Sequence, residues 1–579
     1  MILVAERLCF GEFICFRALT RGVISGYNTL SVLRGQGGLP LNFSTGGLFV
    51  ADLKKEIERR RTFAIISHPD AGKTTLTEKF LLYGGAINLA GSVKGKKTAK
   101  HAVSDWMEIE KERGISVTSS VMQFNYDGYC INILDTPGHQ DFSEDTYRTL
   151  MAADSAVMVI DASKGVEAQT IKLFKVCLLR NIPIFTFINK MDREARDPFD
   201  LMDEIESVLG IKTCPMNWPI GNGKDFRGVY DRRTRHIHAF TAFANGQKAV
   251  DDTDLTLDSP EITGVIGDEL YEKLVEDVEL LDGASNEFNI KEVTEGKLSP
   301  VFFGSALTNF GIELFLNYFL EMTSSPLPRL SDEGLVDSFD PDFSAFVFKI
   351  QANMNKAHRD RIAFMRICSG KFDAGMEVYH VQGNKKQKLL QPQQLMASER
   401  KVVSEAYAGD IIGVFDPGIF SIGDTLCVPG KKFRYEGIPT FAPEHFAKVR
   451  QVDTMKRKQF IKGISQIAQE GAIQIFQEYN TGMEEIIVGV VGVLQFDVLK
   501  HRLLTEYGVE IRMDTMPHEY IRWIANKDEI DASKIIGTSD MKRIKDLKGN
   551  PLLLFVHEWA VNTVLDKNKG LELSEFGRW

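Results

Sequence analysis

The chain has 579 residues, more than one hydrophobic core supports, so we expect three or four domains. Its residues are 44% hydrophobic and 26% charged, which is the ordinary balance of a soluble globular protein. The formal net charge of −10 excludes a protein that coats bare nucleic acid by electrostatics alone, so a nucleic-acid partner has to meet local basic patches.

The cysteines and the apolar runs indicate the compartment. The seven cysteines are scattered and form no Cys-x-x-Cys pair, which argues against a disulfide framework or a zinc site and favours a reducing cytoplasm. The longest apolar run, "IIVGVVGVL" from Ile486, is too short to cross a bilayer. We therefore expect a cytoplasmic protein with no membrane partner.

Residues 1–49 differ in character from the rest of the chain. They are apolar, with four arginines and with Glu6 and Glu12 as the only acids. We interpret this N-terminal extension as a misplaced translation start, because a GUG codon at Val50, which opens "VADLKKEIERRR", would be read as the initiating methionine. An organelle transit peptide is the alternative interpretation.

From Arg61 to about Pro326, short apolar runs alternate with helical segments. This alternation predicts a doubly wound, mostly parallel α/β sheet in a first domain that spans 53–328. An acidic region of about 213–298 makes an unusually long gap in this pattern, and we interpret it as an inserted subdomain. The strand candidates are Thr62–Ile66, Cys130–Leu134, Ser155–Ile160, Ile182–Ile188 and Val301–Phe303.

The stretch "FAIISHPDAGKTTLTEKF" contains the first motif. It fits G-x-x-x-x-G-K-[ST] except at its first place, where Ser67 replaces glycine. In such a loop the backbone N–H groups surround the phosphates, Lys73 supplies positive charge, and the Thr74 hydroxyl binds Mg²⁺. The residues predicted to contact the nucleotide here are Ser67, His68, Pro69, Asp70, Ala71, Gly72, Lys73, Thr74 and Thr75.

The second motif is "LDTPGH", which ends an apolar strand. Asp135 is placed to hold the metal through water, and Gly138 is placed to offer its N–H to the γ-phosphate and to move when that phosphate leaves. An Asp-x-x-Gly pattern alone is weak, and it gains weight from following the first motif by about sixty residues. The predicted GTP-binding residues are Asp135, Thr136, Pro137, Gly138 and His139.

The third and fourth motifs select the base. In "FINKMD", a carboxylate at Asp192 that accepts both N–H groups of guanine rejects adenine, which lacks that donor pair. In "FFGSAL", two residues are placed to close over the base edge. Four motifs in this order at strand ends predict a site for GTP and GDP with Mg²⁺. The predicted base contacts are Asn189, Lys190, Met191, Asp192, Ser305 and Ala306.

Two further domains are expected after a proline-rich, then acidic linker near residues 324–342. Short strands with turn signals, such as "FSAFVFKIQ" and "RIAFMRICSGKF", predict a small β-barrel over 340–436. From about Phe441 the order becomes β-α-β-β-α-β, the ferredoxin-like arrangement, in a domain over 441–579 that includes a C-terminal tail without a clear pattern. The predicted fold class is thus multidomain: α/β, then β-barrel, then α+β.

The quoted motifs also carry a family resemblance. "DWMEIEKERGI" with "DTPGH" and "NKMD" resembles the ribosome-dependent translational GTPases, the group that contains elongation factor G. Within that group the chain resembles the bacterial peptide chain release factor 3 family from about Leu53 to at least Trp523, through stretches such as "NWPIGNGKDFRGVYD", "FVFKIQANMNKAHRDRIAFMRICSGKF" and "VGVLQFDVLKHRL". Members carry a hydroxyl residue after "RGI" that coordinates Mg²⁺, here Ser116, so the implied metal ligands are Thr74, Ser116 and Asp135.

The resemblance implies a task in translation termination. A ribosome-dependent GTPase of this family is expected to promote dissociation and recycling of the codon-reading class I release factors after peptide release. The expected partners are the ribosome, through its RNA and proteins, and those release factors; DNA is not expected, and the protein is expected to be a monomer. His139 is implied as the catalytic residue, aimed at the attacking water with the help of ribosomal RNA.

Three other functions remain as alternatives. Another ribosomal GTPase, of the elongation or ribosome-protection type, fits the motifs, although the chain length and the "RGIS" form argue against it. A P-loop kinase or ATPase leaves "NKMD" and the barrel without a purpose. A GTP-binding switch without turnover leaves His139 without a purpose.

Overall fold

The structure is a computed structural model, and it describes residues 45–86, 110, 116–240, 252–352, 361–390, 392–396, 399–438, 441–479 and 486–575. Residues 1–44 of the expected misplaced start and the stretch "DWMEIEKERGI", except Glu110, lie outside this description. Helix α2 (Thr45–Glu58) comes first, and the chain from Leu53 onward forms one compact unit. Within the described part of the chain, no helix combines the length and apolarity needed to cross a membrane.

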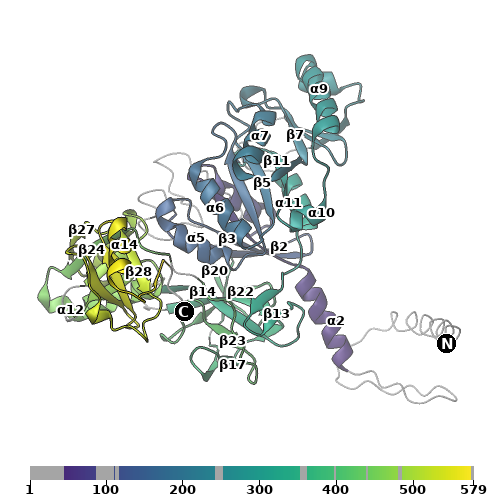
Figure 1. The fold of residues 1–579 in the computed structure, drawn as a ribbon. Coiled ribbons are helices and arrows are strands. Elements are labelled where there is room, and N and C mark those ends of the chain that lie inside the picture. The colour runs from purple at the N-terminus through teal and green to yellow at the C-terminus, as the bar shows by residue number, and fades with distance from the viewer. Residues whose placement is uncertain are drawn as a thin grey trace, which may run out of the picture. The chain divides into compact units, whose positions relative to one another are not determined.

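The first large sheet confirms the predicted doubly wound α/β architecture (Figure 1). Its seven strands run in the order β2-β3-β1-β4-β5-β11-β6, and only the edge pair β2–β3 is antiparallel. All five predicted strands are present. The strands are β1 (Arg60–Ser67), β2 (Ser120–Tyr126), β3 (Tyr129–Asp135), β4 (Ser155–Asp161), β5 (Ile184–Asn189), β6 (Lys212–Pro215) and β11 (Leu298–Phe303).

Helices cover both faces of this sheet. Helices α3 (Lys73–Tyr83) and α11 (Ile312–Met322) pack on one face, in the same cluster as Phe63 and Ile65 of β1. The alternating residues Ala64 and Ile66 belong to the opposite cluster, which includes side chains of α5 (Ser143–Leu150), α6 (Ala168–Leu179) and α7 (Pro198–Leu209). Burial on both faces explains why β1 is a continuous apolar run without polar alternation.

Strand β2 was not predicted from the sequence. It forms a hairpin with β3 around Asp127 and Gly128, whose φ angles of 44° and 78° are those of a two-residue turn with both central residues left-handed. An Asp-Gly pair between two apolar runs was the available signal.

The region expected to hold an inserted subdomain forms a separate antiparallel sheet in the order β10-β9-β8-β7. Helix α9 begins at Asp268 and buries Leu274, Val278 and Leu281 along one side. The elements of this region are β7 (Asn217–Ile220), β8 (Gly228–Asp231), β9 (His236–Phe240), β10 (Asp252–Thr256), α8 (Ile262–Ile266), α9 (Asp268–Ala284) and α10 (Ile290–Thr294).

The predicted β-barrel region is entirely β in its described residues. An eight-stranded antiparallel sheet runs in the order β18-β17-β23-β14-β15-β22-β19-β20. A short hairpin, β12–β13, and a short antiparallel pair of strands distant in the chain, β16–β21, accompany it. The strands are β12 (Arg329–Ser331), β13 (Gly334–Val336), β14 (Ser344–Ala352), β15 (Arg361–Ser369), β16 (Lys371–Asp373), β17 (Glu377–His380), β18 (Lys385–Lys388), β19 (Gln393–Met396), β20 (Glu399–Val402), β21 (Glu405–Tyr407), β22 (Ile411–Phe415) and β23 (Thr425–Cys427).

The C-terminal part begins with the predicted β-α-β-β-α-β order. The sheet order β27-β24-β26-β25 is that of a ferredoxin-like domain, and Phe460, Ile464 and Leu499 on its two helices pack into one core. The elements are β24 (His445–Gln451), α12 (Arg457–Gln469), β25 (Gln474–Glu478), β26 (Ile486–Val490), α13 (Leu494–Tyr507) and β27 (Ile511–Met516).

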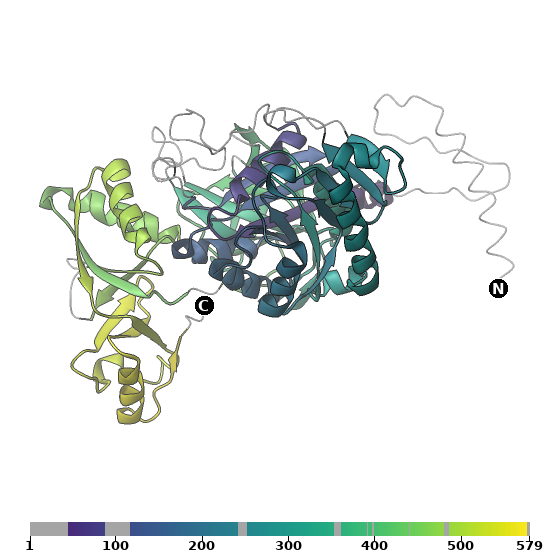
Figure 2. The same ribbon diagram turned by 90° about the horizontal axis from the view of Figure 1, so that it is seen from above.

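The tail after Tyr520, which showed no clear pattern in the sequence, is an ordered extension of that sheet. Strand β29 pairs with β25, so four more strands continue the ferredoxin-like sheet to eight, as the lime and yellow parts of Figure 2 show. Its elements are β28 (Tyr520–Ile524), β29 (Lys542–Asp546), β30 (Pro551–Phe555), α14 (Glu558–Lys567) and β31 (Leu573–Ser574).

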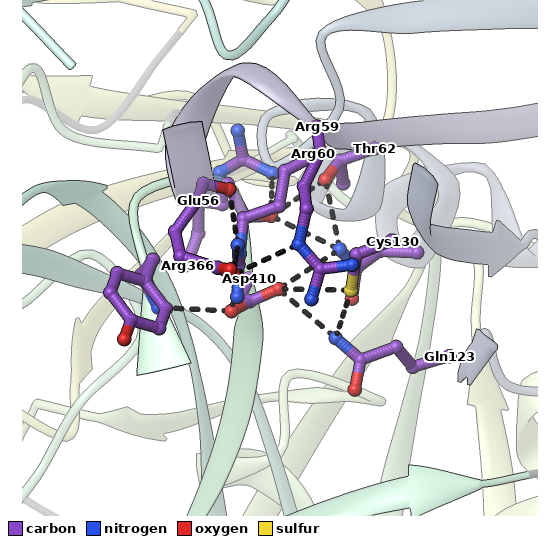
Figure 3. Close-up of polar contacts among 11 residues, drawn as sticks. Glu56, Arg59, Arg60, Thr62, Gln123, Cys130, Arg366 and Asp410 are labelled. Atoms are coloured by element: carbon purple, nitrogen blue, oxygen red, sulfur yellow. Dashed lines mark hydrogen bonds and ion pairs between the residues drawn. The ribbon is translucent and has the colours of Figure 1, made fainter. Parts of the chain in front are cut away.

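Asp410, in the turn before β22, joins the barrel to the base of the first sheet (Figure 3). One carboxylate oxygen accepts from Arg60 Nε at 2.7 Å and from the amide of Tyr407 at 2.9 Å, and the other accepts from Gln123 Nε2 at 3.0 Å. The nearby Cys130 thiol has its pKa raised to about 12, chiefly by burial and then by the Asp410 charge, so it stays protonated at neutral pH. The Asp410 carboxylate thus accepts hydrogen bonds both from the first sheet and from the barrel.

We expect Asp410→Ala to lower the free energy of unfolding by about 1–3 kcal/mol, because it removes one of the two carboxylates that contact the buried Arg60 guanidinium and leaves Glu56, 2.8 Å from Nη1, as the other. The Arg60 side chain is 6% exposed, so water replaces little of the lost interaction. The onset of thermal unfolding measures the effect. Asp373→Ala is the matched control, since that barrel carboxylate is 64% exposed beside Lys371 and its loss should cost less than about 1 kcal/mol. Equal shifts in the two variants would contradict the prediction.

Candidate nucleotide-binding site

The four sequence motifs meet at one edge of the first sheet. Strand β1 ends at Ser67, β3 at Asp135, β5 at Asn189 and β11 at Phe303, and all four strands are parallel. Because the carboxyl ends of parallel strands lie at the same edge, the loops that follow them face a common crevice. The expected convergence is therefore present.

The loop between β1 and α3 has the backbone of a phosphate-binding turn. Asp70 and Gly72 have φ angles of 66° and 99°, a left-handed conformation that turns successive amides toward one side. A Cβ at Gly72 would lie 2.2 Å from Asn189 Nδ2, so glycine is required there by space as well as by φ. Ser67 keeps a φ that any residue adopts and donates its buried hydroxyl to the His68 carbonyl at 2.9 Å, which explains how serine replaces the usual glycine.

Lys73 and Asp135 form a buried ion pair at the centre of the site. The Lys73 ammonium contacts Asp135 Oδ1 directly, and the two side chains are only 6% and 2% exposed. Thr77 donates to the Lys73 carbonyl at 3.1 Å from the next turn of α3. A cation and a carboxylate held together below an amide-lined loop fit a triphosphate, which would draw the ammonium to its own oxygens and free the carboxylate.

Asn189 connects three of the motifs. Its Nδ2 donates to the Ala71 carbonyl at 2.9 Å, and its Oδ1 accepts from the amides of Lys190 and Ala306, each at 2.8 Å. Asn189 is 2% exposed, and these contacts hold the loops around Ala71 and Ala306 in position. Met191 is fully buried and its amide donates to Gly304, which places Asp192 at the surface of the crevice.

Asp161, at the end of β4, is a site residue that the sequence interpretation missed. Its carboxylate accepts from Lys190 Nζ at 2.6 Å, and Lys190 also reaches the Asp70 carbonyl in the phosphate-binding loop. Burial alone would raise the Asp161 pKa, but the hydrogen bonds from Lys190 and Ser163 outweigh it and hold the pKa below its ordinary value. The aspartate at the end of the "VMVID" run, one strand away from β1, was the available signal.

Asp192 and Ser305 face each other where the base is expected. Ser305 donates its hydroxyl to Asp192 Oδ1 at 2.5 Å, and the Ser305 hydroxyl also accepts from the Thr308 amide at 3.3 Å. The second oxygen of Asp192 is thereby left to a ligand, and the arrangement fits a carboxylate that receives paired N–H groups.

The second motif lies against the phosphate-binding loop. A Cβ at Gly138 would be 3.4 Å from the Pro69 Cα, and Thr136 donates its hydroxyl to the Ile65 carbonyl at 2.6 Å. His139 caps a short 3₁₀ turn, Gln140–Phe142, and accepts the Asp141 amide at Nδ1 at 3.3 Å. Its imidazole is 31% exposed, so one face remains open to solvent.

The remaining predicted residues surround this centre. Thr74 and Thr75 are half-buried in the first turn of α3, Pro137 is buried before Gly138, and His68 Nε2 lies 3.3 Å from Glu167 Oε1. Ser116 is half-buried ahead of Val117, whose amide donates to Glu110 at 2.9 Å. Its role as a metal ligand stays a prediction.

The donor set fits Mg²⁺ bound together with phosphate. Within the described ranges, no group of three or more His, Cys, Asp and Glu side chains gathers to hold a metal by itself. Mg²⁺ prefers oxygen ligands and is commonly held by one or two protein groups plus substrate phosphates, which the Thr74 hydroxyl and the Asp135 carboxylate match.

Comparison with known proteins gives the family. The chain matches the models of the elongation factor Tu GTP binding domain over 58–325, elongation factor G domain 2 over 342–429, and the class II release factor RF3 C-terminal domain over 435–565. It is 59% identical over 90% of its length to a peptide chain release factor 3 from Symbiobacterium thermophilum, of which 98% is covered. The chain belongs to the peptide chain release factor 3 family.

Other members of the family agree with this assignment. Peptide chain release factor 3 from Listeria innocua is 54% identical, and that from Cyanothece sp. is 52% identical, each over 90% of this chain and over 99% and 96% of the relative. A crystal structure of a protein from Thermus thermophilus has a TM-score of 0.64 at 21% identity over 84% of this chain and 72% of the other, which shows a shared fold. As a member of this family with a matching GTP-binding domain, the protein is a GTPase that binds guanine nucleotides.

Proposed function

We propose that the protein hydrolyses GTP on the ribosome in translation termination and uses this step to promote dissociation and recycling of the class I release factors. Family membership over 90% of the chain carries the proposal. The convergence of the four motifs at one sheet edge supports it. The cytoplasm is the proposed location.

Each site residue has a proposed role in binding. The amides of the loop from Asp70 to Thr74 and the Lys73 ammonium hold the phosphates, since they are the donors nearest to the N-terminus of α3. Asp192 accepts the N–H groups of guanine, and the peptide at Ser305–Ala306 closes over the base edge.

Thr74, Asp135 and Ser116 are the proposed ligands of Mg²⁺. When bound, the ion neutralises charge on the β- and γ-phosphate oxygens. The contact between Lys73 and the Asp135 carboxylate supports a role for both groups beside the phosphates.

The proposed chemistry depends on position and charge more than on covalent steps. Lys73 and the loop amides stabilise the charge that develops on the leaving oxygen, and the His139 imidazole orients the attacking water. Loss of the γ-phosphate removes a contact of the Gly138 amide, so the segment after it is free to change position. Hydrolysis thereby shifts which arrangement of domains is stable.

The domain boundaries are part of the proposal. We assign a GTPase domain to 53–328 with an insertion at about 213–298, a barrel to 340–436, and a ferredoxin-like domain with its extension to 441–579. The Asp410 junction supports a barrel that moves together with the GTPase domain, because separating them would expose the buried Arg60 charge.

GTP turnover by the purified protein, with and without ribosomes and with ATP as control, tests the function. We expect ribosomes to raise turnover by roughly 10³-fold or more, as activators in trans do for other GTPases, and we expect ATP to be left untouched. A release-factor recycling assay then measures the termination step. Turnover that is indifferent to ribosomes would contradict the proposal.

A further inference from the structure

Asp141 lies between the proposed catalytic histidine and another domain. It follows His139 by two residues, and its side chain is only 7% exposed. One carboxylate oxygen, Oδ1, lies 3.2 Å from His139 Nδ1, and the Asp141 amide donates to the same nitrogen at 3.3 Å. Nδ1 accepts from the amide when it carries no proton and donates to Oδ1 when it carries one, so Asp141 contacts the Nδ1 edge in either state and leaves Nε2 as the nitrogen available to a water or a phosphate.

The other carboxylate oxygen belongs to a contact with the ferredoxin-like domain. Asp141 Oδ2 accepts the backbone amide of Leu494, the first residue of α13, at 2.8 Å. The N-terminus of a helix favours a negative charge, so the contact is stabilised by the helix dipole as well as by the hydrogen bond. One carboxylate therefore connects α13 to the imidazole of His139.

The segment that leads into α13 leaves Asp141 no room to move closer. A Cβ at Gly492 would lie 2.1 Å from Asp141 Cγ. This segment is itself held in place, because Gln495 Oε1 accepts the amides of Val491 and Gly492 at 2.8 and 3.1 Å while its Nε2 donates to Ala472. A displacement of the segment is therefore transmitted to Asp141 rather than absorbed within it.

An apolar contact beside Asp141 joins the GTPase domain to the ferredoxin-like domain. Phe142 packs against Val498 of α13 and against Val117, which lies one residue after the proposed metal ligand Ser116. All three side chains are buried. The ferredoxin-like domain thus touches both segments that flank the proposed γ-phosphate position.

We propose that Asp141 is a positioning residue that sets the orientation of the His139 imidazole according to where the N-terminus of α13 lies. The proposal rests on the proposed function of His139. A shift of α13 carries the Leu494 amide away from Asp141, the carboxylate rotates, and the imidazole loses the contact that fixes its Nδ1 edge. Movement of the ferredoxin-like domain on the ribosome in this way reaches the His139 imidazole through Asp141.

Gly492→Ala tests the link from the side of the ferredoxin-like domain, without altering any residue of the GTPase site. The added methyl displaces the Asp141 carboxylate, and the backbone at Gly492 accepts alanine because its φ lies outside the left-handed region. We expect ribosome-stimulated kcat to fall at least tenfold while GTP affinity stays within twofold. In a His139→Ala background the same substitution should cause no further loss, because the imidazole that it acts on is gone.

Two control variants separate this effect from general loosening. Gly283→Ala adds a methyl that meets nothing within 4 Å, and turnover should stay unchanged. Val498→Ala weakens the same domain contact without touching Asp141, and it should keep most of the turnover at a matched loss of thermal stability. Equal losses in Val498→Ala and Gly492→Ala would overturn the proposal, as would a Gly492→Ala effect below twofold or one that adds to His139→Ala.

The same variants distinguish failure of the inference from failure of the proposed function. A His139→Ala protein that keeps full turnover overturns both, because Asp141 acts through that imidazole. If ribosomes do not stimulate the parent protein, only the proposed function fails. Ribosome-free single turnover of the parent and of Gly492→Ala then still decides the link: a change of fivefold or more supports it, and a smaller change overturns it.

Discussion

His139→Ala is expected to bind GTP normally and to lose ribosome-stimulated turnover by about 10³-fold or more. The imidazole makes no contact that holds the nucleotide loops together: its hydrogen bond is to the neighbouring Asp141 amide, and the ring is partly open to solvent. Its removal should therefore act on kcat rather than on binding. Single-turnover hydrolysis with saturating ribosomes, beside a fluorescent-nucleotide titration, measures both quantities.

Gln140→Ala is the matched control for the histidine. Gln140 is exposed and follows His139 directly, so it tests whether any change in this turn disturbs the ribosome contact. We expect its stimulated turnover to stay within about threefold of the parent. A His139→Ala protein with unchanged stimulated turnover would refute the catalytic role, whereas one with lost affinity would indicate a structural role.

Asp192→Asn is expected to weaken GTP binding by roughly 10²–10⁴-fold and to relax the preference for guanine. The amide of asparagine presents N–H groups where guanine also presents N–H groups, so a donor meets a donor. Xanthine carries a carbonyl in place of the exocyclic amine, and the variant should therefore bind xanthosine triphosphate better than the parent does. Competition titrations with GTP, ATP and xanthosine triphosphate give the three affinities.

The Ser305 contact makes this test stricter. Ser305 occupies one oxygen of Asp192 in the structure, and asparagine is able to keep that hydrogen bond through its own oxygen. The loop should thus stay in place while only the base contact changes. Asp203→Asn, on the exposed side of α7, is the control, and equal affinities for all nucleotides in the two variants would argue against the assignment.

The sequence predicted the GTPase domain best because its signals are local. An apolar strand followed by "GKT" specifies strand, turn and helix within about twenty residues, and β1 and α3 lie where that pattern puts them. The strand ends then had to converge, since parallel strands share an edge. Asn189 was predicted as a base contact, which stays a prediction, and the sequence did not indicate that it also connects the loops around Ala71 and Ala306. A motif gives residue types, but not the partners that distant segments supply.

The parts that escaped prediction depend on pairing across long stretches of chain. The tail after Tyr520 has short strands and few repeats, and it becomes regular only because β25 offers an open edge to β29. Asp410 looked like an ordinary turn residue in "YAGDIIGVF", and its importance comes from Arg60, which no local pattern connects to it. Asp141 likewise gains its second contact from Leu494.

The separation of Arg60 and Asp410 has a consequence for biosynthesis. These partners lie 350 residues apart, so a nascent chain carries β1 long before the barrel that supplies Asp410 exists. At translation rates of 5–20 residues per second, that interval is roughly 20–70 s. During that interval Arg60 lacks its contact with Asp410, so this junction forms only late in synthesis. The rate of translation therefore sets when this contact between the two domains forms.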